Sequence, residues 1–527
     1  MKSFWALGLV CLAICQVANS YRILAVFPLH GKSHSVMTHA LAKGLAKRGH
    51  QIDVVSHFPL ENPIPNYKDI SIKGSIPAVV NNISANDIDQ FNQINVKHFV
   101  EMAGNQICEL LGLPQLQQII KNPPTDPPYD LVITEVFAAP CYLAFGQLLN
   151  IPVIGIVTCS NLDWLNYPTG NPMNPAYMPS LFSTYTQEMN FLERLANTFM
   201  ITAIIGQVNY YFGYQDEIVE KYFGPGYPPV NEMHKNLSLV LVNSHRALNG
   251  IRPLTHSVVE VAGLQFKDEQ APLPADVQKW LDDSKEGVIY FTFGSMVRFE
   301  TFPPEVVREF YGAFEKVAPI RILLKVARKE DLLPGLPKNV MIKPWFSQIP
   351  ILRHKNVKAF ITHGGLMGTQ ESVYCGVPMI GIPFFGDQHV NVKTYARRKI
   401  AIAFESIQDV TAEKLADAIK TIVNDPTYSA NVKVLSKQLM DRPMSAMDTA
   451  IYWIEYIGRH GATTLQSPAI RLTWWQRYLL DILALVLITL YVAVKILCFV
   501  VKKAGCFVFG AKCSKKESKA MKAKKNK

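Results

Sequence analysis

The sequence predicts an α/β protein with two domains, each built on a parallel sheet, followed by one membrane-spanning helix. The chain has 527 residues, too many for one ordinary hydrophobic core. Strand-like apolar runs alternate with helix-like segments in both halves, an order that produces parallel strands. A charged stretch with two prolines, FKDEQAPLPAD at 266–276, separates the halves.

The first half begins with a strand, a helix and a second strand. YRILAVFPL at 21–29 is a buried type of strand, residues 33–49 have helical spacing, and QIDVVS at 51–56 is the next strand. The alternation continues with YDLVIT (129–134), a helix near 141–149, PVIGIV (152–157) and SLVLVNS (238–244). The last of these runs is expected to end the half.

Residues 160–230 of this half look irregular and are dense in Tyr, Phe, Trp and Pro, with ITAIIGQVNYYFGY at 201–214 as their most apolar part. Burial in the core is the commoner fate of such residues. An apolar substrate pocket or a membrane-contacting surface is the alternative.

The second half restarts the same alternation. Its expected elements are GVIYFTFGS (287–295), a helix near 304–316, RILLKVA (321–327), NVMIKPW (339–345), VKAFITH (357–363) and PMIGIPFF (378–385). Two α/β halves in one chain place the natural ligand site in the cleft between them.

The N-terminus has the layout of a secretory signal peptide. Residues 1–20 contain a basic Lys2, an apolar run from Phe4 to Cys15, and small residues before Tyr21. The apolar run is too short to cross a bilayer, so an N-terminal anchor is the weaker alternative.

A transmembrane helix is predicted at residues 479–501. Ile482 to Val501 is a 20-residue apolar run whose one charge, Lys495, can reach the interface. Aromatic residues precede it, and ten lysines against one acid follow it in 502–527. This distribution predicts a single-pass type I protein with a cytosolic basic tail and its remaining mass in the lumen.

The basic character belongs to this tail. Without it the formal charge falls from +11 to +2, so the sequence does not predict nucleic-acid binding. The final residues, Lys524-Lys525-Asn526-Lys527, resemble the dilysine retrieval signal of endoplasmic reticulum membrane proteins. The predicted location is therefore the endoplasmic reticulum membrane.

Lumenal exposure bears on cysteines and glycosylation. Cys108, Cys141, Cys159 and Cys375 lie far apart and lack a framework spacing, so no essential disulfide is predicted. The sequons at Asn82 and Asn236 become candidate N-glycosylation sites.

The stretch THGGLMGTQES predicts a nucleotide diphosphate site. Its strand ends at Thr362, and Gly364 and Gly365 let a ligand approach the N-terminus of the next helix, where free N–H groups bind anions. Glu371 can accept two ribose hydroxyls. Ser295 ends another strand on the same edge and offers a hydroxyl to the phosphates.

Two other interpretations of this stretch are weaker. A nicotinamide fingerprint requires G-x-G-x-x-G at the start of a domain, whereas this G-G-x-x-G lies deep inside one, although Asp387 follows Gly365 by 22 residues. Glycines that serve only a tight turn would not explain why one tryptophan and several polar residues lie at successive strand ends: Trp345, Gln348, His363, Glu371, Asp387 and Gln388.

From Trp345 to Gln388 the order W-x-x-Q, HGG, Glu, G-V-P and D-Q resembles the signature of the UDP-glycosyltransferases. The resemblance extends over nearly the whole chain, and HGG-L-x-G-T-Q-E is most similar to insect members. It implies a GT-B fold of two Rossmann-like domains facing a cleft. The implied segments are an acceptor domain at 21–265, a UDP-sugar domain at 276–440, and a helix and stalk at 441–478.

The resemblance also implies roles for donor-site residues. Trp345 would stack on uracil and Gln348 would contact its edge. Ser295 and His363 would hold the diphosphate and Glu371 the ribose. Asp387 and Gln388 would bind sugar hydroxyls. The remaining implied donor-site residues are glycines: Gly364, Gly365 and Gly368. Two positions depart from the family pattern, namely Ser347, where many relatives have Pro, and Met367, where many have Asn.

A histidine near the first helix start is the candidate general base. His30, His34 and His39 are almost equally eligible from their positions alone. The resemblance selects His34, which would take the proton of the acceptor hydroxyl. A helix N-terminus disfavours imidazolium, so His34 is expected to be neutral.

Such a base needs a carboxylate that orients it. Relatives carry Asp after the strand that corresponds to YDLVIT, where this chain has Glu135. Counting back from Pro140-Cys141 lands instead on Val136, which has no carboxylate. We therefore choose Glu135, with an ordinary strand-end surface acid as the alternative.

The predicted reaction is a single inverting transfer of a hexose from a UDP-sugar to a hydroxyl of a small lipophilic acceptor. Insect resemblance favours glucose over glucuronic acid. No cofactor or metal is expected; Asp87-Ile88-Asp89 is a D-x-D, but it follows a polar stretch and is interpreted as a solvated loop. A non-catalytic lipophile- or nucleotide-sugar-binding membrane protein is the alternative, and homo- or hetero-oligomers are compatible with either.

Overall fold

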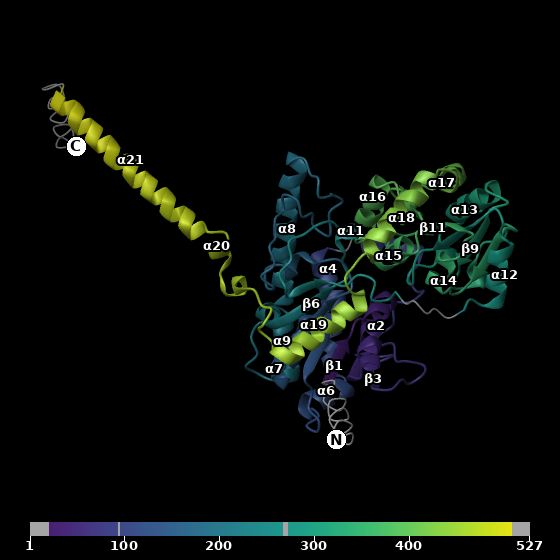
Figure 1. Ribbon diagram of the computed structural model, residues 1–527, viewed down its shortest axis with the longest axis horizontal. Coiled ribbons are helices and arrows are strands. Elements are labelled where there is room, and N and C mark those ends of the chain that lie inside the picture. The colour runs from purple at the N-terminus through teal and green to yellow at the C-terminus, as the bar shows by residue number, and fades with distance from the viewer. Residues whose placement is uncertain (1–19, 93–94, 267–271, 509–527) are drawn as a thin grey trace, which may run out of the picture. The chain divides into compact units, whose positions relative to one another are not determined.

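The computed structural model describes residues 20–92, 95–266 and 272–508 (Figure 1). The chain divides after Ser467 into a large unit with two parallel sheets and a C-terminal unit that begins at Pro468. The predicted signal peptide and most of the basic tail lie outside the described residues.

The first sheet has seven parallel strands in the order β3-β2-β1-β4-β5-β6-β7. Its strands are β1 (Arg22–Phe27), β2 (Gln51–Ser56), β3 (Tyr67–Ser71), β4 (Leu131–Glu135), β5 (Val153–Val157), β6 (Leu237–Val242) and β7 (Val258–Glu260). The expectation that residues 238–244 end this half is wrong, because β7 adds one more short strand at the edge of the sheet.

Helices cover both faces of this sheet. Successive side chains of a strand point to opposite faces, and in these strands the side chains on both faces are apolar. In β1, Leu24 and Val26 pack into one core, and Ile23 and Ala25 into the other. The helices of this half are α2 (Lys32–Arg48), α3 (Ala85–Asn92), α4 (Val96–Val100), α5 (Gln106–Cys108), α6 (Pro114–Lys121), α7 (Ala144–Leu149), α8 (Phe191–Phe212), α9 (Gln215–Phe223), α10 (Val230–Met233) and α11 (Arg246–Asn249).

The second sheet has six parallel strands in the order β10-β9-β8-β11-β12-β13. They are β8 (Val288–Thr292), β9 (Arg321–Lys325), β10 (Val340–Lys343), β11 (Val357–Thr362), β12 (Met379–Gly381) and β13 (Ala401–Ala403). Its helices are α12 (Ala275–Asp283), α13 (Pro304–Lys316), α14 (Gln348–Leu352), α15 (Leu366–Tyr374), α16 (Gln388–Arg397), α17 (Ala412–Asn424) and α18 (Pro426–Met440).

Two segments join the halves of the large unit. After α18 the chain returns to the first half, where α19 (Ala446–His460) lies beside α2 (Figure 1) and buries Ile454 and Ile457 in the core under the first sheet. The loop between β3 and α3 contacts the second half. The backbone N–H of Asn81 in this loop donates to the Ser295 carbonyl at 2.8 Å.

Part of the region expected to be irregular is a long helix. α8 begins with a capping box in which the Asn190 and Glu193 side chains each accept from the other residue's backbone N–H. Ile201, Ile204 and Val208 face the core at helical spacing. The opposite face is also apolar, with Phe199 67% exposed, so the periodicity that indicates an amphipathic helix is weak in the sequence.

The D-x-D is also placed differently from the expectation. Asp87 lies in α3 instead of a solvated loop, and its carboxylate accepts hydrogen bonds from the backbone N–H and hydroxyl of Ser84, both at 2.7 Å. Asp87 therefore stabilises the first turn of a helix.

The structure contains a disulfide that the cysteine spacing did not predict, because Cys108 and Cys141 are bonded to each other. The bond joins α5 to the turn before α7, both buried in the first half. The pairing could not be predicted from the sequence, because the two cysteines are separated by 33 residues and become neighbours only when the chain folds.

Removal of this disulfide is expected to destabilise the large unit. Because the bond closes a loop of 33 residues, the Cys108→Ala/Cys141→Ala variant should lose about 3–4 kcal/mol and melt several degrees lower. Thermal unfolding of the detergent-solubilised chain would measure this, with Cys498→Ala, an exposed free cysteine, as control. Equal melting temperatures for all three proteins would contradict the expectation.

The C-terminal unit contains α20 (Trp474–Arg477) and α21 (Leu480–Val508). Leu480–Gly505 is long and apolar enough to cross a membrane by its length and composition. The predicted span at 479–501 falls almost entirely within this helix.

Candidate functional site

A cleft of about 920 Å³ lies between the two sheets. Its walls come from the loop after β1 and the start of α2 on one side, and from the strand ends of the second sheet with α15 on the other. Most of the predicted site residues line it: His34, Ser295, Trp345, Gln348, His363, Gly365, Gly368, Glu371, Asp387 and Gln388.

Sheet topology explains this convergence. The order of strands reverses between β1 and β4 in the first sheet and between β8 and β11 in the second. In open parallel sheets the crevice at such a reversal is the usual ligand site. His34 follows β1 and Glu135 ends β4, while Ser295 follows β8 and His363 follows β11.

His34 is held by two residues from neighbouring strand ends. Its Nδ1 lies 2.5 Å from Glu135 Oε1, and the Thr158 hydroxyl lies 2.7 Å from both atoms. A carboxylate can only accept, so Nδ1 carries the hydrogen and donates it to Glu135. The neutral ring then has its lone pair on Nε2. Glu135, at 2% side-chain exposure, is a buried partner and not a surface acid.

The expectation that His34 is neutral because it lies at a helix start is not supported. Burial by itself lowers the pKa of His34, but the carboxylates of Glu135 and Asp387 outweigh burial and raise the net pKa above its ordinary value. His34 is thus a stronger base than a free imidazole and becomes neutral only at a correspondingly higher pH.

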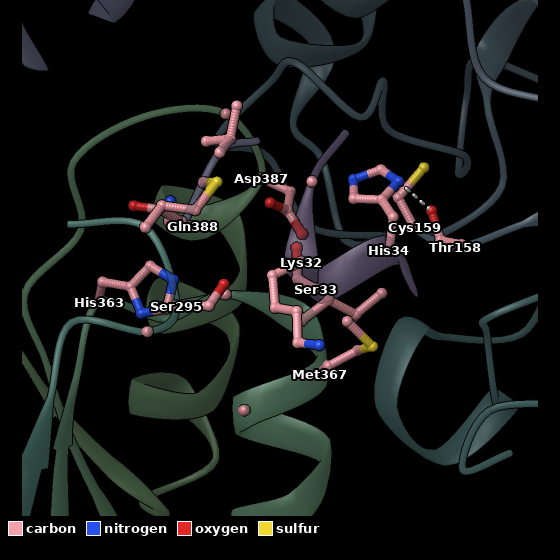
Figure 2. Close-up of a pocket in the computed structure, with 18 of the residues that line it drawn as sticks. Lys32, Ser33, His34, Thr158, Cys159, Ser295, His363, Met367, Asp387 and Gln388 are labelled. Atoms are coloured by element: carbon pink, nitrogen blue, oxygen red, sulfur yellow. Dashed lines mark hydrogen bonds between the residues drawn. The ribbon is translucent and has the colours of Figure 1, made fainter. Parts of the chain in front are cut away.

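Figure 2 shows His34 and Thr158 on one side of the cleft and Ser295 and His363 on the other, with Asp387 between them. The second ring nitrogen of His34 lies on the side of Asp387. A molecule placed between the two groups can contact His34 from the first sheet and the polar strand ends of the second at the same time.

The end of the cleft at Ser295 and His363 is suited to anions. Gly294 has a φ of 79°, and a Cβ there would lie 2.5 Å from the His363 ring, so this turn requires glycine. Burial and the charge of Lys325 lower the pKa of His363 to about 4. The ring is therefore neutral, and its buried Nδ1 has no partner among the described residues.

The glycines in and just after the HGG motif have different structural roles. Gly364 has a φ of 86°, and a Cβ there would meet Val392 at 2.4 Å, so it serves the turn and its packing on α16. It does not line the cleft, which differs from the expectation that it admits a ligand. Gly365 and Gly368 do line it, at the N-terminus and first turn of α15.

Glu371 and Gln348 form a pair on the wall beside Trp345. The Gln348 amide donates to Glu371 Oε2 at 2.7 Å, and burial raises the pKa of Glu371 to about 7. Trp345 keeps 50% of its surface exposed, so one ring face is available for stacking. A carboxylate beside an accessible indole can hold a ribose below a stacked base.

Asp387 and Gln388 lie at the start of α16, and each side chain already forms hydrogen bonds within the protein. Asp387 Oδ2 accepts from the Asn391 amide at 2.9 Å, and burial raises the pKa of Asp387. The Gln388 amide oxygen accepts from the backbone N–H groups of Phe384 and Phe385. Gln388 can therefore offer a ligand its amide nitrogen.

The end of the cleft beyond His34 is aromatic. Phe137 contacts the His34 ring edge-to-face at 5.3 Å, and Phe99 contacts Phe137 in the same way at 5.2 Å. Trp164 and Phe182 complete this wall with nearly parallel rings. Such a surface favours apolar, planar molecules.

Several site residues were missed from the sequence. Thr158 and Cys159 follow β5, and Lys325 ends β9, where each lines the cleft. The available signal was their place at the end of an apolar strand or directly after it, on the same edge as the predicted residues. The structure also distinguishes the three histidines that were candidates for the base. His30 lines the cleft beside His34, whereas His39 faces a second cavity of about 540 Å³.

Comparison with known proteins agrees with this geometry. The model of the family described as "UDP-glucoronosyl and UDP-glucosyl transferase" matches residues 23–520. The chain belongs to this UDP-glycosyltransferase family. The glycosyltransferase is 38% identical to UDP-glucosyltransferase 2 of Dactylopius coccus, over 93% of each chain. It is 29% identical to UDP-glucuronosyltransferase 2B16 of Oryctolagus cuniculus, over 92% of this chain and 96% of the relative.

A solved structure confirms the predicted fold. The glycosyltransferase resembles the crystal structure of the glycotransferase of kitacinnamycin with a TM-score of 0.55 at 19% identity. The match covers 83% of this chain and 98% of the other. The fold is thus two parallel-sheet α/β domains of the GT-B type, with an apolar C-terminal helix.

Proposed function

We propose that this enzyme transfers a hexose, with glucose favoured, from a UDP-sugar to a hydroxyl of small lipophilic acceptors. The observation that carries the proposal is the position of His34, bonded to Glu135, across one cleft from Ser295 and His363. The arrangement provides a base for an acceptor and an anion site for a leaving diphosphate.

The proposed step is one displacement. The acceptor oxygen attacks the anomeric carbon while Nε2 of His34 takes the hydroxyl proton. The bond from that carbon to the β-phosphate oxygen breaks, and its electron pair leaves with UDP. Attack from the face opposite the leaving group converts an α-linked donor into a β-glycoside. Glu135 stabilises the imidazolium that forms.

The donor is proposed to lie along the second sheet. Trp345 stacks on uracil, Gln348 contacts its edge, and Glu371 accepts the ribose hydroxyls. Ser295 and His363 contact the diphosphate with the N-terminus of α15. The sugar hydroxyls are assigned to Asp387 and Gln388. The proposal requires no metal or separate cofactor, since the UDP-sugar is a co-substrate.

Two observations support the choice of substrates. The relative with 38% identity is named a UDP-glucosyltransferase, while the glucuronosyltransferase is less similar at 29%. The aromatic wall of Phe99, Phe137, Trp164 and Phe182 lies next to the base, which favours phenols and other planar lipophiles. Detoxification of such compounds is the proposed role.

The proposed location is the endoplasmic reticulum membrane, with the two α/β domains in the lumen. It rests on the predicted signal peptide, α21 and the dilysine tail. Asn82 and Asn236 are both exposed, which leaves room for glycans at the predicted sites.

A donor panel tests the proposal. Membranes containing the protein would receive UDP-glucose, UDP-glucuronate or UDP-galactose with phenols and flavonoids, and UDP release would be measured. We expect the highest rate with UDP-glucose and a β-anomeric product by proton NMR. An α-anomeric product would contradict the single displacement, and a clear preference for UDP-glucuronate would contradict the choice of sugar.

Glu371 predicts a pH dependence of nucleoside binding. Ribose hydroxyls bind the carboxylate and not the acid, so binding favours the ionised form and strengthens as the pH rises through the pKa of about 7. Uridine, which has no phosphate to titrate, should bind about tenfold more tightly at pH 8 than at pH 6. Calorimetry or ligand-observed NMR would measure this.

Glu371→Gln is the matched control for that titration, because it keeps the shape and removes the ionisation. Its uridine affinity should be weak and constant between pH 6 and pH 8. A pH dependence equal to that of the wild type would assign the titration to another group.

A further inference from the structure

Lys325 is a buried cation on the donor side of the cleft. It is the last residue of β9, keeps 7% of its surface exposed, and lines the cleft with Ser295, Trp345 and His363. Lysines are rarely buried to this extent unless a negative group accompanies them. The partner of this charge is therefore informative.

Within the described residues, the partners of Lys325 do not neutralise its charge. The ammonium donates to the Gly294 carbonyl and lies 5.5 Å from the centre of the Trp345 ring. None of the ion pairs in these parts of the chain includes Lys325. Glu300 acts on it only through space, and burial lowers the pKa of Lys325 to about 8.

Ser295 and His363, the two side chains assigned to the diphosphate, carry no full positive charge. His363 is neutral, because burial and Lys325 lower its pKa to about 4, and Ser295 offers only a hydroxyl. The N-terminus of α15 supplies partial charge. A full positive charge beside these donors would further stabilise a diphosphate that gains negative charge as its bond to the sugar breaks.

We propose that Lys325 binds the diphosphate of the UDP-sugar and stabilises UDP as it leaves. This inference rests on the donor site proposed above. The bond between the anomeric carbon and the β-phosphate oxygen breaks, and its electron pair remains on that oxygen beside the ammonium. The acceptor proton goes to His34, so Lys325 only supplies charge.

Its position also joins two parts of the donor site. The bond to the Gly294 carbonyl fixes the turn that presents Ser295, and the ammonium lies near the ring of Trp345. A structural role through Trp345 would affect uracil, whereas a role at the diphosphate would affect only ligands that carry phosphates. This difference makes the two roles separable.

The test compares UDP and uridine. Affinities of both ligands would be measured by calorimetry on the detergent-solubilised full chain, for wild type, Lys325→Met and Lys325→Arg. We expect Lys325→Met to weaken UDP binding about 10- to 100-fold while uridine changes less than about twofold. Lys325→Arg should restore part of the UDP affinity, because it restores the charge.

Lys343→Met is the matched control. Lys343 pairs with Lys325 across β9 and β10 in the same sheet, but it forms an ion pair with Asp276 and does not line the cleft. Its substitution should leave both affinities unchanged.

Two outcomes would overturn the proposal. Equal loss of uridine and UDP affinity in Lys325→Met would place the role of the lysine at Trp345, and unchanged UDP affinity would make it only an anchor for Gly294. Failure of the donor site itself is distinguishable, because wild-type protein would then bind UDP no better than uridine.

Discussion

Replacement of His34 with alanine is expected to lower kcat by about 10²- to 10⁴-fold and to leave UDP-glucose affinity nearly unchanged. In the proposed reaction the His34 imidazole takes the proton of the acceptor hydroxyl, and it lies across the cleft from the residues proposed to bind the donor. Its loss should therefore affect the chemical step and not donor binding. Initial rates of UDP release, with calorimetric affinities on the same preparations, would measure both quantities.

His39→Ala is the matched control, since His39 lies on the same helix but faces the second cavity. It should retain most of the wild-type kcat. If His34→Ala kept more than about a tenth of the wild-type rate, or if His39→Ala lost as much, the assignment of the base would be wrong.

Replacement of Glu135 with glutamine is expected to lower kcat by 10²-fold or more, on the order of the effect known for such buried carboxylates. The amide can offer its NH₂ group to Nδ1, which would favour the tautomer with hydrogen on Nε2. In that tautomer Nε2 has no free lone pair, so it cannot take the proton of the substrate hydroxyl. Rates at saturating UDP-glucose would measure the loss.

The same substitution should move the pH profile in a defined direction. The carboxylates raise the pKa of His34 above its ordinary value, and burial alone would lower it. Wild-type activity should therefore rise with pH through this raised pKa, and Glu135→Gln should shift the acidic limb of kcat/KM to lower pH. Glu135→Asp, which retains the charge, should shift it less. An unshifted limb in Glu135→Gln would show that Glu135 does not act on His34.

Much of the fold could be predicted because its strands are buried on both faces and read as continuous apolar runs. Once these strands are located, the segments between them must hold the helices and turns. The helix at 304–316 and the turn at HGG were therefore placed correctly. The helix α8 was missed because its exposed face is also apolar, and β7 because three residues give no pattern. The Cys108–Cys141 bond depends on tertiary packing that spacing does not encode.

The candidate site was predictable where residues follow apolar strands at the sheet edges. Proximity across the molecule was not, so the hydroxyl of Thr158 beside His34 and the ammonium of Lys325 near Trp345 emerged only from the fold. The expected direction of the pKa shift of His34 was wrong for a related reason. A helix start acts locally, whereas Asp387 approaches from the other sheet and helps to raise the pKa.

Acceptor-dependent release of UDP from UDP-glucose tests the central claim most directly. Membranes with wild-type protein would be compared with His34→Ala over the phenol and flavonoid panel, after both are shown to bind UDP-glucose. The account predicts turnover by the wild type with at least one acceptor and loss of that turnover in the variant. Binding of UDP-glucose by both proteins, with equal background rates throughout, would contradict it and favour a non-catalytic binding protein.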